Sequence, residues 1–258
     1  MAMNRPVDAW EGQRAWIVGA STGIGAALAT HLIDRGCRVA LSARRTGPLE
    51  RITARAPDRT LVLPLDVTDA RAVSAAHGTL CAQWSGVDMA FVVAGQYQPM
   101  RAWDLALPVF RSQLEVNVMG AVNVVLQLLP GFLAGGHGRI VLVSSVAGYR
   151  ALPKALAYGT TKAALTHFAE GLYLDLAPRG IAVHVVHPGF VRTPLTAGND
   201  FRMPALISAE DAAAEMLRGL ERGEFEIHYP KRFTWWMKVL RVLPYRWYFP
   251  LVHRLTGL

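Results

Sequence analysis

The sequence predicts an α/β protein with a doubly wound parallel β-sheet. Short runs rich in Val and Ile alternate with longer stretches in which apolar residues recur at helical spacing. The short runs are almost continuously apolar, which is typical of strands covered by helices on both faces. A glycine-rich turn follows the first run and opens the first helical stretch. Strand–helix repetition of this kind indicates parallel strands joined by right-handed crossovers.

The expected elements follow one another without an internal repeat, a low-complexity segment or a linker before residue 229. Strands are expected over residues 15–19, 38–41, 60–65, 87–93, 139–143 and 181–186. Helices are expected over residues 24–35, 69–84, 107–133, 156–177 and 208–222. We therefore expect one domain, residues 1–229, followed by a C-terminal appendage, residues 230–258.

The glycine turn, residues 19–25 with the sequence GASTGIG, joins the first strand to the first helix. Glycine permits a sharp turn and a close approach of a phosphate to the backbone, and the helix N-terminus supplies unpaired N–H groups. The spacing G-x-x-x-G-x-G differs from the standard dinucleotide fingerprint, and a tight turn without a ligand is the alternative. The residues expected to bind a dinucleotide here are Gly19, Ser21, Thr22, Gly23, Ile24 and Gly25.

The second expected strand ends with arginines where NAD-binding folds carry a carboxylate for the ribose 2′-hydroxyl. A guanidinium such as that of Arg44 is well suited to bind a 2′-phosphate, so the sequence favours NADP(H) over NAD(H). The alternative is that Arg44 and Arg45 are a solvated helix start. Asp66, at the end of the third strand, is expected to accept a hydrogen bond from the adenine amino group, or else to cap the next helix.

Tyr158 and Lys162 are four residues apart, which places them on one face of an expected helix. An unperturbed tyrosine has a pKa of about 10, roughly three units above neutral pH, which is worth about 4 kcal/mol. A nearby ammonium and a bound nicotinamide cation favour the phenolate, so we expect a lowered pKa for Tyr158 and proton transfer by its phenol. Ser145 lies just past a strand end, where its hydroxyl can donate a hydrogen bond to the same carbonyl oxygen.

Taken together, these motifs resemble the short-chain dehydrogenase/reductase family, in its branch of about 250 residues. The resemblance covers roughly residues 12–228 and implies a Rossmann-like fold. It rests on GASTGIG (19–25), LDV (65–67), VAG (93–95), the segment around Asn117, SSVAG (144–148), YGTTK (158–162) and HPGFVRTP (187–194).

The resemblance assigns roles to individual residues. It implies that Tyr158 is the acid/base and that Lys162 lowers its pKa and binds the nicotinamide ribose. Ser145 would orient the substrate oxygen, and Asn117 would support a water-mediated proton relay to Lys162. Besides Tyr158 and Lys162, the cofactor contacts implied are Val67, Ala94, Gly95, Pro188, Gly189 and Thr193. Because family members are often dimers or tetramers, a homodimer or homotetramer is expected.

Two positions depart from the family pattern. Where the family usually has Asn-Asn-Ala-Gly after the fourth strand, this chain has Val92-Val93-Ala94-Gly95, which removes a side-chain contact within the sheet and leaves the chemistry intact. Ser21 and Thr22 stand where many NADP-preferring members carry a basic residue. Arg44 is therefore expected to carry most of the preference for the 2′-phosphate.

Composition excludes several other classes of protein. Of 258 residues, 52% are hydrophobic and 18% are charged, which excludes a disordered chain. Cys37 and Cys81 have no ligand-like spacing, and His184 and His187 have no carboxylate at ligand spacing, so no metal site or disulfide scaffold is expected. Neither a signal peptide nor an uninterrupted apolar stretch of about 18 residues is evident. A reducing, cytoplasmic location fits best.

The appendage, residues 230–258, combines seven aromatic residues and six Lys/Arg with no Asp or Glu, and carries most of the net charge of +8. This composition is typical of an amphipathic helix lying on an anionic membrane surface. It fits equally well a C-terminal helix packed on the body or on a partner subunit. Nucleic-acid binding is not expected, because the body offers no basic face.

The sequence thus predicts an NADP(H)-dependent oxidoreductase that interconverts a ketone and a secondary alcohol. The largely apolar segments after Ser145 and Gly189 favour a hydrophobic carbonyl substrate over a sugar. A 3-oxoacyl thioester reductase is the alternative among enzymes. A membrane-associated, NADP-binding regulator is the non-catalytic alternative, and the complete set of Ser145, Tyr158 and Lys162 argues against it, since binding alone does not need all three.

Overall fold

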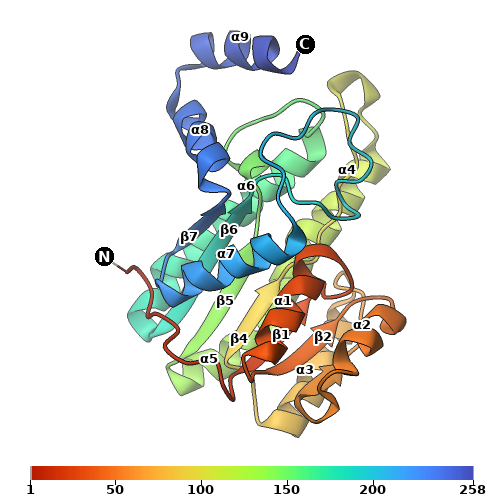
Figure 1. Cartoon of the computed structure of the whole chain (residues 1–258), viewed down its shortest axis with the longest axis vertical. Helices are drawn as coiled ribbons and strands as arrows, with labels where there is room; N and C mark the ends of the chain where they lie inside the picture. The colour runs from red at the N-terminus through yellow and green to blue at the C-terminus, as the bar shows by residue number, and fades with distance from the viewer. Residues whose placement is uncertain (1, 258) are drawn as a thin grey trace.

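The computed structural model describes residues 2–257 and contains a seven-stranded parallel β-sheet with helices on both faces (Figure 1). The strands are β1 (Arg14–Val18), β2 (Arg38–Ser42), β3 (Thr60–Val62), β4 (Met89–Val92), β5 (Gly138–Val143), β6 (Ile181–Pro188) and β7 (Glu226–Tyr229). They are ordered β3-β2-β1-β4-β5-β6-β7. The chain changes direction across the sheet between β1 and β4, and in such sheets ligands bind beyond the carboxyl ends of the strands at this point.

Helices cover both faces of the sheet, and the last two helices lie beyond its carboxyl end (Figure 1). The helices are α1 (Gly23–Asp34), α2 (Thr46–Thr53), α3 (Ala70–Trp84), α4 (Leu107–Leu114), α5 (Gly120–Gly135), α6 (Leu156–Leu176), α7 (Ala209–Glu221), α8 (Lys231–Val242) and α9 (Tyr245–Thr256). This arrangement confirms the predicted doubly wound, Rossmann-like α/β fold.

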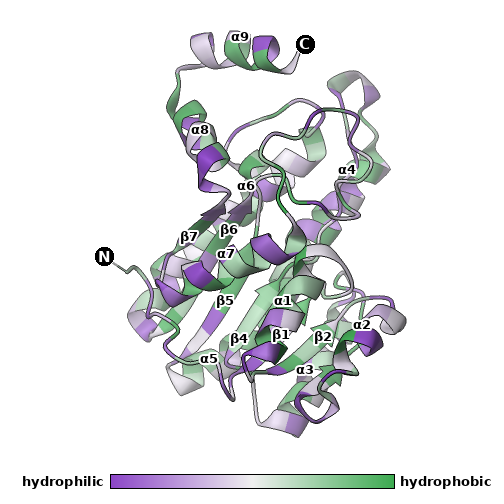
Figure 2. Ribbon diagram, viewed as in Figure 1, coloured by the Kyte–Doolittle hydropathy of each residue, from purple (hydrophilic) through white to green (hydrophobic). Residues whose placement is uncertain are grey.

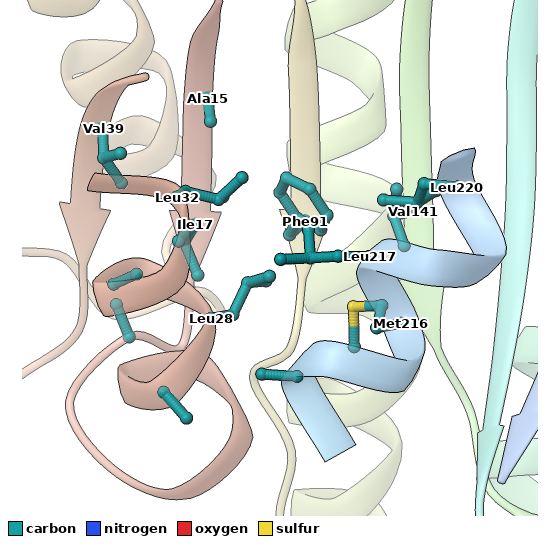
Figure 3. Packing of buried hydrophobic residues seen from close by; sticks show 14 of the residues in the cluster. Ala15, Ile17, Leu28, Leu32, Val39, Phe91, Val141, Met216, Leu217 and Leu220 are labelled. Atoms are coloured by element: carbon teal, nitrogen blue, oxygen red, sulfur yellow. The ribbon is translucent and has the colours of Figure 1, made fainter. Parts of the chain in front are cut away.

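Successive side chains of each strand enter opposite cores. Ile17 and Phe91 meet Leu28 of α1 and Leu217 of α7 on one face (Figure 3). On the other face, Trp16 and its neighbours pack with side chains of α3, α5 and α6. Because strand side chains alternate between faces and both faces are covered, the strands are apolar at nearly every position.

Three features differ from the elements expected from the sequence. Helix α2 was not predicted, because Gly47 and Pro48 in its first turn are typical of a loop, although proline is tolerated there. Strand β7 was not predicted either, because it is short and carries the polar residues Glu226 and His228. The helix expected over residues 107–133 is interrupted by a π-helical turn, Glu115–Met119.

The run Leu107–Gly135 is long and apolar enough to cross a membrane, judged by length and composition alone. The sequence analysis noted no such stretch because polar residues such as Arg111 and Glu115 interrupt it. In the structure Val124, Val125 and Leu128 of α5 are buried in the core against the sheet. One face of this run therefore packs in the protein core.

The appendage forms α8 and α9, which lie beyond the carboxyl end of the sheet (Figure 1). Pro244 immediately precedes α9 and separates it from α8. Met237 of α8 is buried in a small cluster with Val146 and Tyr149, which Phe233 and Leu240 also contact. One face of α8 thus packs on the body, on the loop that follows β5.

Candidate active site

A cavity of about 1000 Å³ opens at the carboxyl ends of the central strands. It gathers almost all of the site residues predicted from the sequence. Those that line it are Gly19, Ser21, Thr22, Gly23, Ile24, Arg44, Asp66, Val67, Ala94, Gly95, Ser145, Tyr158, Lys162, Pro188, Gly189 and Thr193. Gly25 and Asn117 are not in the lining, and both hold neighbouring segments of the lining in place.

The glycine turn is packed too tightly for side chains. Gly19 has a φ of +101°, and a Cβ there would lie 2.4 Å from the backbone nitrogen of Ala94. A Cβ on Gly25 would lie 2.1 Å from the carbonyl oxygen of Gly19. Thr22, the residue before α1, makes no side-chain capping bond to the helix. The first-turn N–H groups of α1 therefore lack a side-chain cap at the cavity, which is the arrangement that binds a phosphate.

The far end of the cavity carries the two arginines and Asp66. Arg44 and Arg45 are exposed and form no ion pair among residues 2–257. Asp66 accepts hydrogen bonds from the backbone N–H and hydroxyl of Thr68, at 3.0 and 2.8 Å. The backbone bond from Thr68 lowers the pKa of Asp66. The cap of α3 is Asp69, so the structure rules out helix capping by Asp66, which stays a carboxylate at the cavity.

Tyr158 and Lys162 lie in the first turns of α6, and Ser145 follows β5. The Nζ atom of Lys162 lies 5.6 Å from the centroid of the Tyr158 ring and donates to the carbonyl oxygen of Val143 at 2.8 Å. Burial lowers the pKa of Lys162 to about 8. At neutral pH most of the lysine is therefore still charged.

The pKa of Tyr158 differs from the sequence prediction. Burial raises it to about 12, and a hydrogen bond with Ser145 offsets this only in part. The lowered pKa was expected from a neighbouring ammonium and a bound nicotinamide cation, and desolvation of the phenol acts in the opposite direction. The protein's own groups thus keep Tyr158 protonated at neutral pH, which is the state that can donate a proton.

Asn117 lies in the π-helical turn between α4 and α5. Its Oδ1 accepts from the backbone N–H of Gln96 at 2.7 Å, and its Nδ2 donates to the Gln96 carbonyl at 3.0 Å and to the Thr161 hydroxyl at 2.9 Å. These bonds hold the loop after β4 against α6, beside Lys162. The structure gives Asn117 this positioning role, and the water-mediated relay stays a prediction.

Several lining residues were not predicted from the sequence. Tyr97 contacts Tyr158 edge-on, with ring centroids 5.0 Å apart. Gln96, Ser112 and Val116 also line the cavity, and the position of Gln96 and Tyr97 directly after Gly95 is the one signal that could have indicated them. In the apolar segment after Gly189, Leu195 lines the cavity. In the apolar segment after Ser145, Val146 and Tyr149 contact α8 instead.

A polar network centred on Glu226 links α8 to α6, the helix that carries Tyr158 and Lys162. Glu226 of β7 accepts from the Tyr149 hydroxyl at 2.5 Å and from Lys238 at 2.7 Å, and lies 3.3 Å from Nδ1 of His187. His187 contacts the Thr166 hydroxyl of α6 at 3.0 Å. The sequence analysis found no carboxylate partner for His187 because β7 was not recognised.

The other histidine of β6, His184, has a structural role. His184 is fully buried and contacts Arg139 and the carbonyl oxygen of Glu224, each at 2.5 Å. Within residues 2–257 no group of three His, Cys, Asp or Glu side chains could hold a metal ion.

Replacing Glu226 with Gln is expected to lower the free energy of unfolding at neutral pH by about 1–3 kcal/mol. Burial alone would raise the pKa of Glu226, but hydrogen bonds from His187, Lys238 and Tyr149 outweigh it and hold the pKa well below its usual range. A depressed pKa stabilises the folded state above the unfolded value of about 4.3, and this contribution is lost as the pH falls below that value.

Urea unfolding at several pH values measures this effect. The difference between wild type and Glu226→Gln is expected to shrink as the pH falls from about 6 to about 3. Glu50→Gln is the matched control, because Glu50 is exposed and its carboxylate has no partner among residues 2–257. A difference that stays constant across this pH range would contradict the assigned ionisation of Glu226.

Residues 13–202 match the family model described as short chain dehydrogenase. The chain belongs to the short-chain dehydrogenase family and is an oxidoreductase by this membership. It is 36% identical over 233 residues to a protein of Myxococcus xanthus named "Uncharacterized oxidoreductase", covering 89% of this chain and 92% of that one. It is 34% identical over 201 residues to human "Dehydrogenase/reductase SDR family member 7", covering 71% of this chain and 59% of the human one.

Solved structures show the same fold. A short-chain dehydrogenase from Streptomyces avermitilis superposes with a TM-score of 0.78 at 28% identity, covering 88% of this chain and 92% of that one. A short-chain dehydrogenase from Burkholderia cenocepacia, solved in complex with NADP, has a TM-score of 0.80 at 25% identity and covers 96% of this chain and 98% of its own.

Proposed function

We propose that this protein is an NADPH-preferring oxidoreductase that interconverts a ketone and a secondary alcohol on a hydrophobic substrate. The observation that carries the proposal is that Ser145, Tyr158 and Lys162 line the same cavity as the glycine turn and Arg44. A regulator that only bound the cofactor would not need a phenol, a hydroxyl and an ammonium gathered at one end of the cavity.

The cavity fits a dinucleotide cofactor. The glycine turn and the N-terminus of α1 would hold the diphosphate, and Arg44 would bind the 2′-phosphate. Asp66 and Val67 would face the adenine, and Pro188, Gly189 and Thr193 the nicotinamide. The NADP complex of the Burkholderia cenocepacia neighbour supports this choice of cofactor. When bound, the reduced nicotinamide supplies a hydride to the carbonyl carbon.

Tyr158, Ser145 and Lys162 carry out the proton transfer in this reaction. The Tyr158 phenol donates its proton to the carbonyl oxygen as that oxygen gains negative charge. The Ser145 hydroxyl donates a hydrogen bond to the same oxygen and so holds it at the phenol. The ammonium of Lys162 stabilises the tyrosinate left behind, and in the reverse direction Tyr158 accepts the proton of the alcohol.

The cavity walls favour an apolar substrate. Tyr97, Val116 and Leu195 are apolar or aromatic members of its lining, and the Tyr97 ring contacts that of Tyr158. Gln96 and Ser112 add polar groups. We place the activity in the cytoplasm, which the free thiols of Cys37 and Cys81 support.

The test is NADPH oxidation, followed by absorbance, over a panel of long-chain, aromatic and steroidal ketones and 3-oxoacyl thioesters. Turnover that depends on Tyr158 is expected for at least one hydrophobic ketone. Turnover of the thioesters alone would make the protein a 3-oxoacyl thioester reductase. Tight NADPH binding without turnover of any member of the panel would favour the regulator.

Replacing Arg44 with Ser is expected to weaken NADPH binding about tenfold and to leave NADH binding nearly unchanged. In the proposed complex the Arg44 guanidinium binds the 2′-phosphate, which NADH lacks. Because Arg44 is exposed, solvent screens this interaction and limits the loss of affinity. Calorimetric titration of both cofactors measures the change. Arg51→Ser is the matched control, since Arg51 is exposed on the neighbouring α2 and does not line the cavity. Equal losses for NADPH and NADH in Arg44→Ser would contradict the assignment.

A further inference from the structure

The outward face of α8 and α9 exposes many large apolar side chains to solvent. On α8, Trp235, Val239 and Val242 recur at helical spacing, and Val242 is 79% exposed. On α9, Trp247, Leu251 and Leu255 form a similar row. The complete set of exposed large apolar side chains is Trp235, Trp236, Val239, Val242, Tyr245, Trp247, Phe249, Leu251 and Leu255. Contiguous apolar surface of this kind marks an interaction site.

The inward face of the same helices holds them to the body. Arg150 donates to the carbonyl oxygens of Leu240 and Leu243 at the end of α8, at 3.0 and 2.5 Å. Its guanidinium also lies over the ring of Tyr248, 4.0 Å from the centroid. The Tyr248 hydroxyl donates in turn to the carbonyl oxygen of Ala151. Two of the exposed residues add to these contacts: Arg150 also lies over Tyr245, 4.5 Å from the ring centroid, and Trp235 meets His228 with ring centroids 5.7 Å apart. The other exposed apolar side chains are free to meet a partner.

The charge of this surface selects the kind of partner. Lys238 is paired with Glu226, and Lys231 lies 3.9 Å from Glu224. Arg232, Arg246 and Arg254 are exposed and form no ion pair among residues 2–257. No Asp or Glu occurs between residues 230 and 258. Both hydrophobic and hydrophilic residues occur along α8 and α9 (Figure 2). The Arg246 guanidinium lies over the exposed ring of Trp247, 4.9 Å from its centroid.

A second copy of this surface is a poor partner. A two-fold dimer places the same patch of both subunits in contact, so the arginines of one copy would face those of the other with no carboxylate between them. An anionic bilayer offers both kinds of partner, because its negative headgroups can pair with the arginines and its acyl chains can bury the apolar side chains. Trp and Tyr favour the bilayer interface, and the long stems of arginine reach from apolar surface to headgroups.

We propose that the outward face of α8 and α9 binds the surface of an anionic membrane, with the two helices lying in the interface and neither crossing it. This binding would also bring the catalytic cavity to the bilayer. Helix α8 follows the carboxyl end of β7, and the segments before α4 and between β6 and α7 rise at the same end of the molecule (Figure 1). These segments carry the exposed Trp103, Leu105 and Phe201, so this end of the molecule exposes further apolar side chains.

The test is co-sedimentation of the full chain with vesicles of phosphatidylcholine, with and without about 30 mol% phosphatidylserine. The wild type is expected to bind the anionic vesicles and to be released as salt is raised. Trp236→Ser/Val242→Ser/Trp247→Ser and Arg232→Gln/Arg246→Gln/Arg254→Gln are each expected to bind at least about tenfold more weakly. Both variants should keep wild-type NADPH affinity and melting temperature, since the substituted side chains are exposed.

Matched controls come from the opposite end of the molecule. Leu174 is 74% exposed near the end of α6, and Leu174→Ser should bind vesicles as the wild type does. Arg38→Gln/Arg179→Gln should likewise have little effect. Failure of the wild type to bind anionic vesicles would overturn the proposal, and so would full binding by the apolar variant. If the wild type is an oligomer that does not bind vesicles, and the apolar variant is a monomer, then the partner is a second copy of the chain and the proposal is wrong.

Discussion

Tyr158→Phe is expected to lower turnover by about 10²- to 10⁴-fold, the range usually contributed by a positioned acid or base, and to leave NADPH affinity within a few-fold of wild type. The substitution removes only the hydroxyl that carries the proton. Steady-state kinetics on the best ketone, together with calorimetric titration of NADPH, separate the two effects. The rate of ketone reduction by the wild type is expected to decline as the pH rises above about 8, because Lys162 then loses its charge.

Tyr97→Phe is the matched control for this prediction. The Tyr97 phenol lines the same cavity and its ring contacts that of Tyr158, so both variants lose a hydroxyl from the same environment. Tyr97→Phe should retain turnover within about tenfold, because its hydroxyl is not assigned to proton transfer. The catalytic assignment would be wrong if Tyr97→Phe lost the activity and Tyr158→Phe kept it.

Gly25→Ala is expected to abolish measurable NADPH binding and to lower the free energy of unfolding by about 3 kcal/mol. The added Cβ would lie 2.1 Å from the carbonyl oxygen of Gly19 and 3.2 Å from the Cα of Ala20. Both contacts are to backbone atoms of the turn itself, so no side-chain rotation relieves them. The turn must open, and the opening displaces the first N–H groups of α1. Calorimetry and urea unfolding measure the two losses.

Gly78→Ala provides the comparison. Gly78 lies within α3, where an added Cβ meets nothing within 4 Å. Alanine is the better helix former, so this variant should gain about 0.5–1 kcal/mol of stability and bind NADPH normally. Normal NADPH affinity in Gly25→Ala would show that the glycine turn does not bind the cofactor.

The residues that line the cavity could be predicted because their signals are local. Tyr158 and Lys162 share one helix, and the residues of the glycine turn are contiguous, so spacing along the chain is enough to place them together. The ends of parallel strands meet at one edge of the sheet, which brought Ser145, Arg44 and Asp66 to the same cavity. These are placements that follow from secondary structure and topology alone.

What the sequence did not reveal depends on tertiary contacts. Strand β7 carries Glu226, whose burial is acceptable only because Lys238, Tyr149 and His187 surround it. No pattern within four residues can show such partners. The raised pKa of Tyr158 has the same origin, since desolvation by the surrounding side chains is not visible from its spacing to Lys162.

The two faces of α8 illustrate the same limit. Helical spacing identified an amphipathic segment, but not which apolar residues would pack inward. The structure uses Met237 and Phe233 for packing against Tyr149 and leaves Trp235 and Trp236 outside. The inward face of α8 packs on the body, as one of the two alternatives predicted, and membrane binding by the exposed residues stays a proposal.

The measurement that tests the proposed chemistry most directly uses NADPH carrying deuterium at C4 of the nicotinamide, prepared in both stereochemical forms. Each form is incubated with the enzyme and the ketone panel, and the alcohols formed are analysed by mass spectrometry. One form is expected to place a single deuterium on the carbinol carbon with the wild type, and almost none with Tyr158→Phe. NADPH that binds tightly yet labels no alcohol from either form would contradict the account.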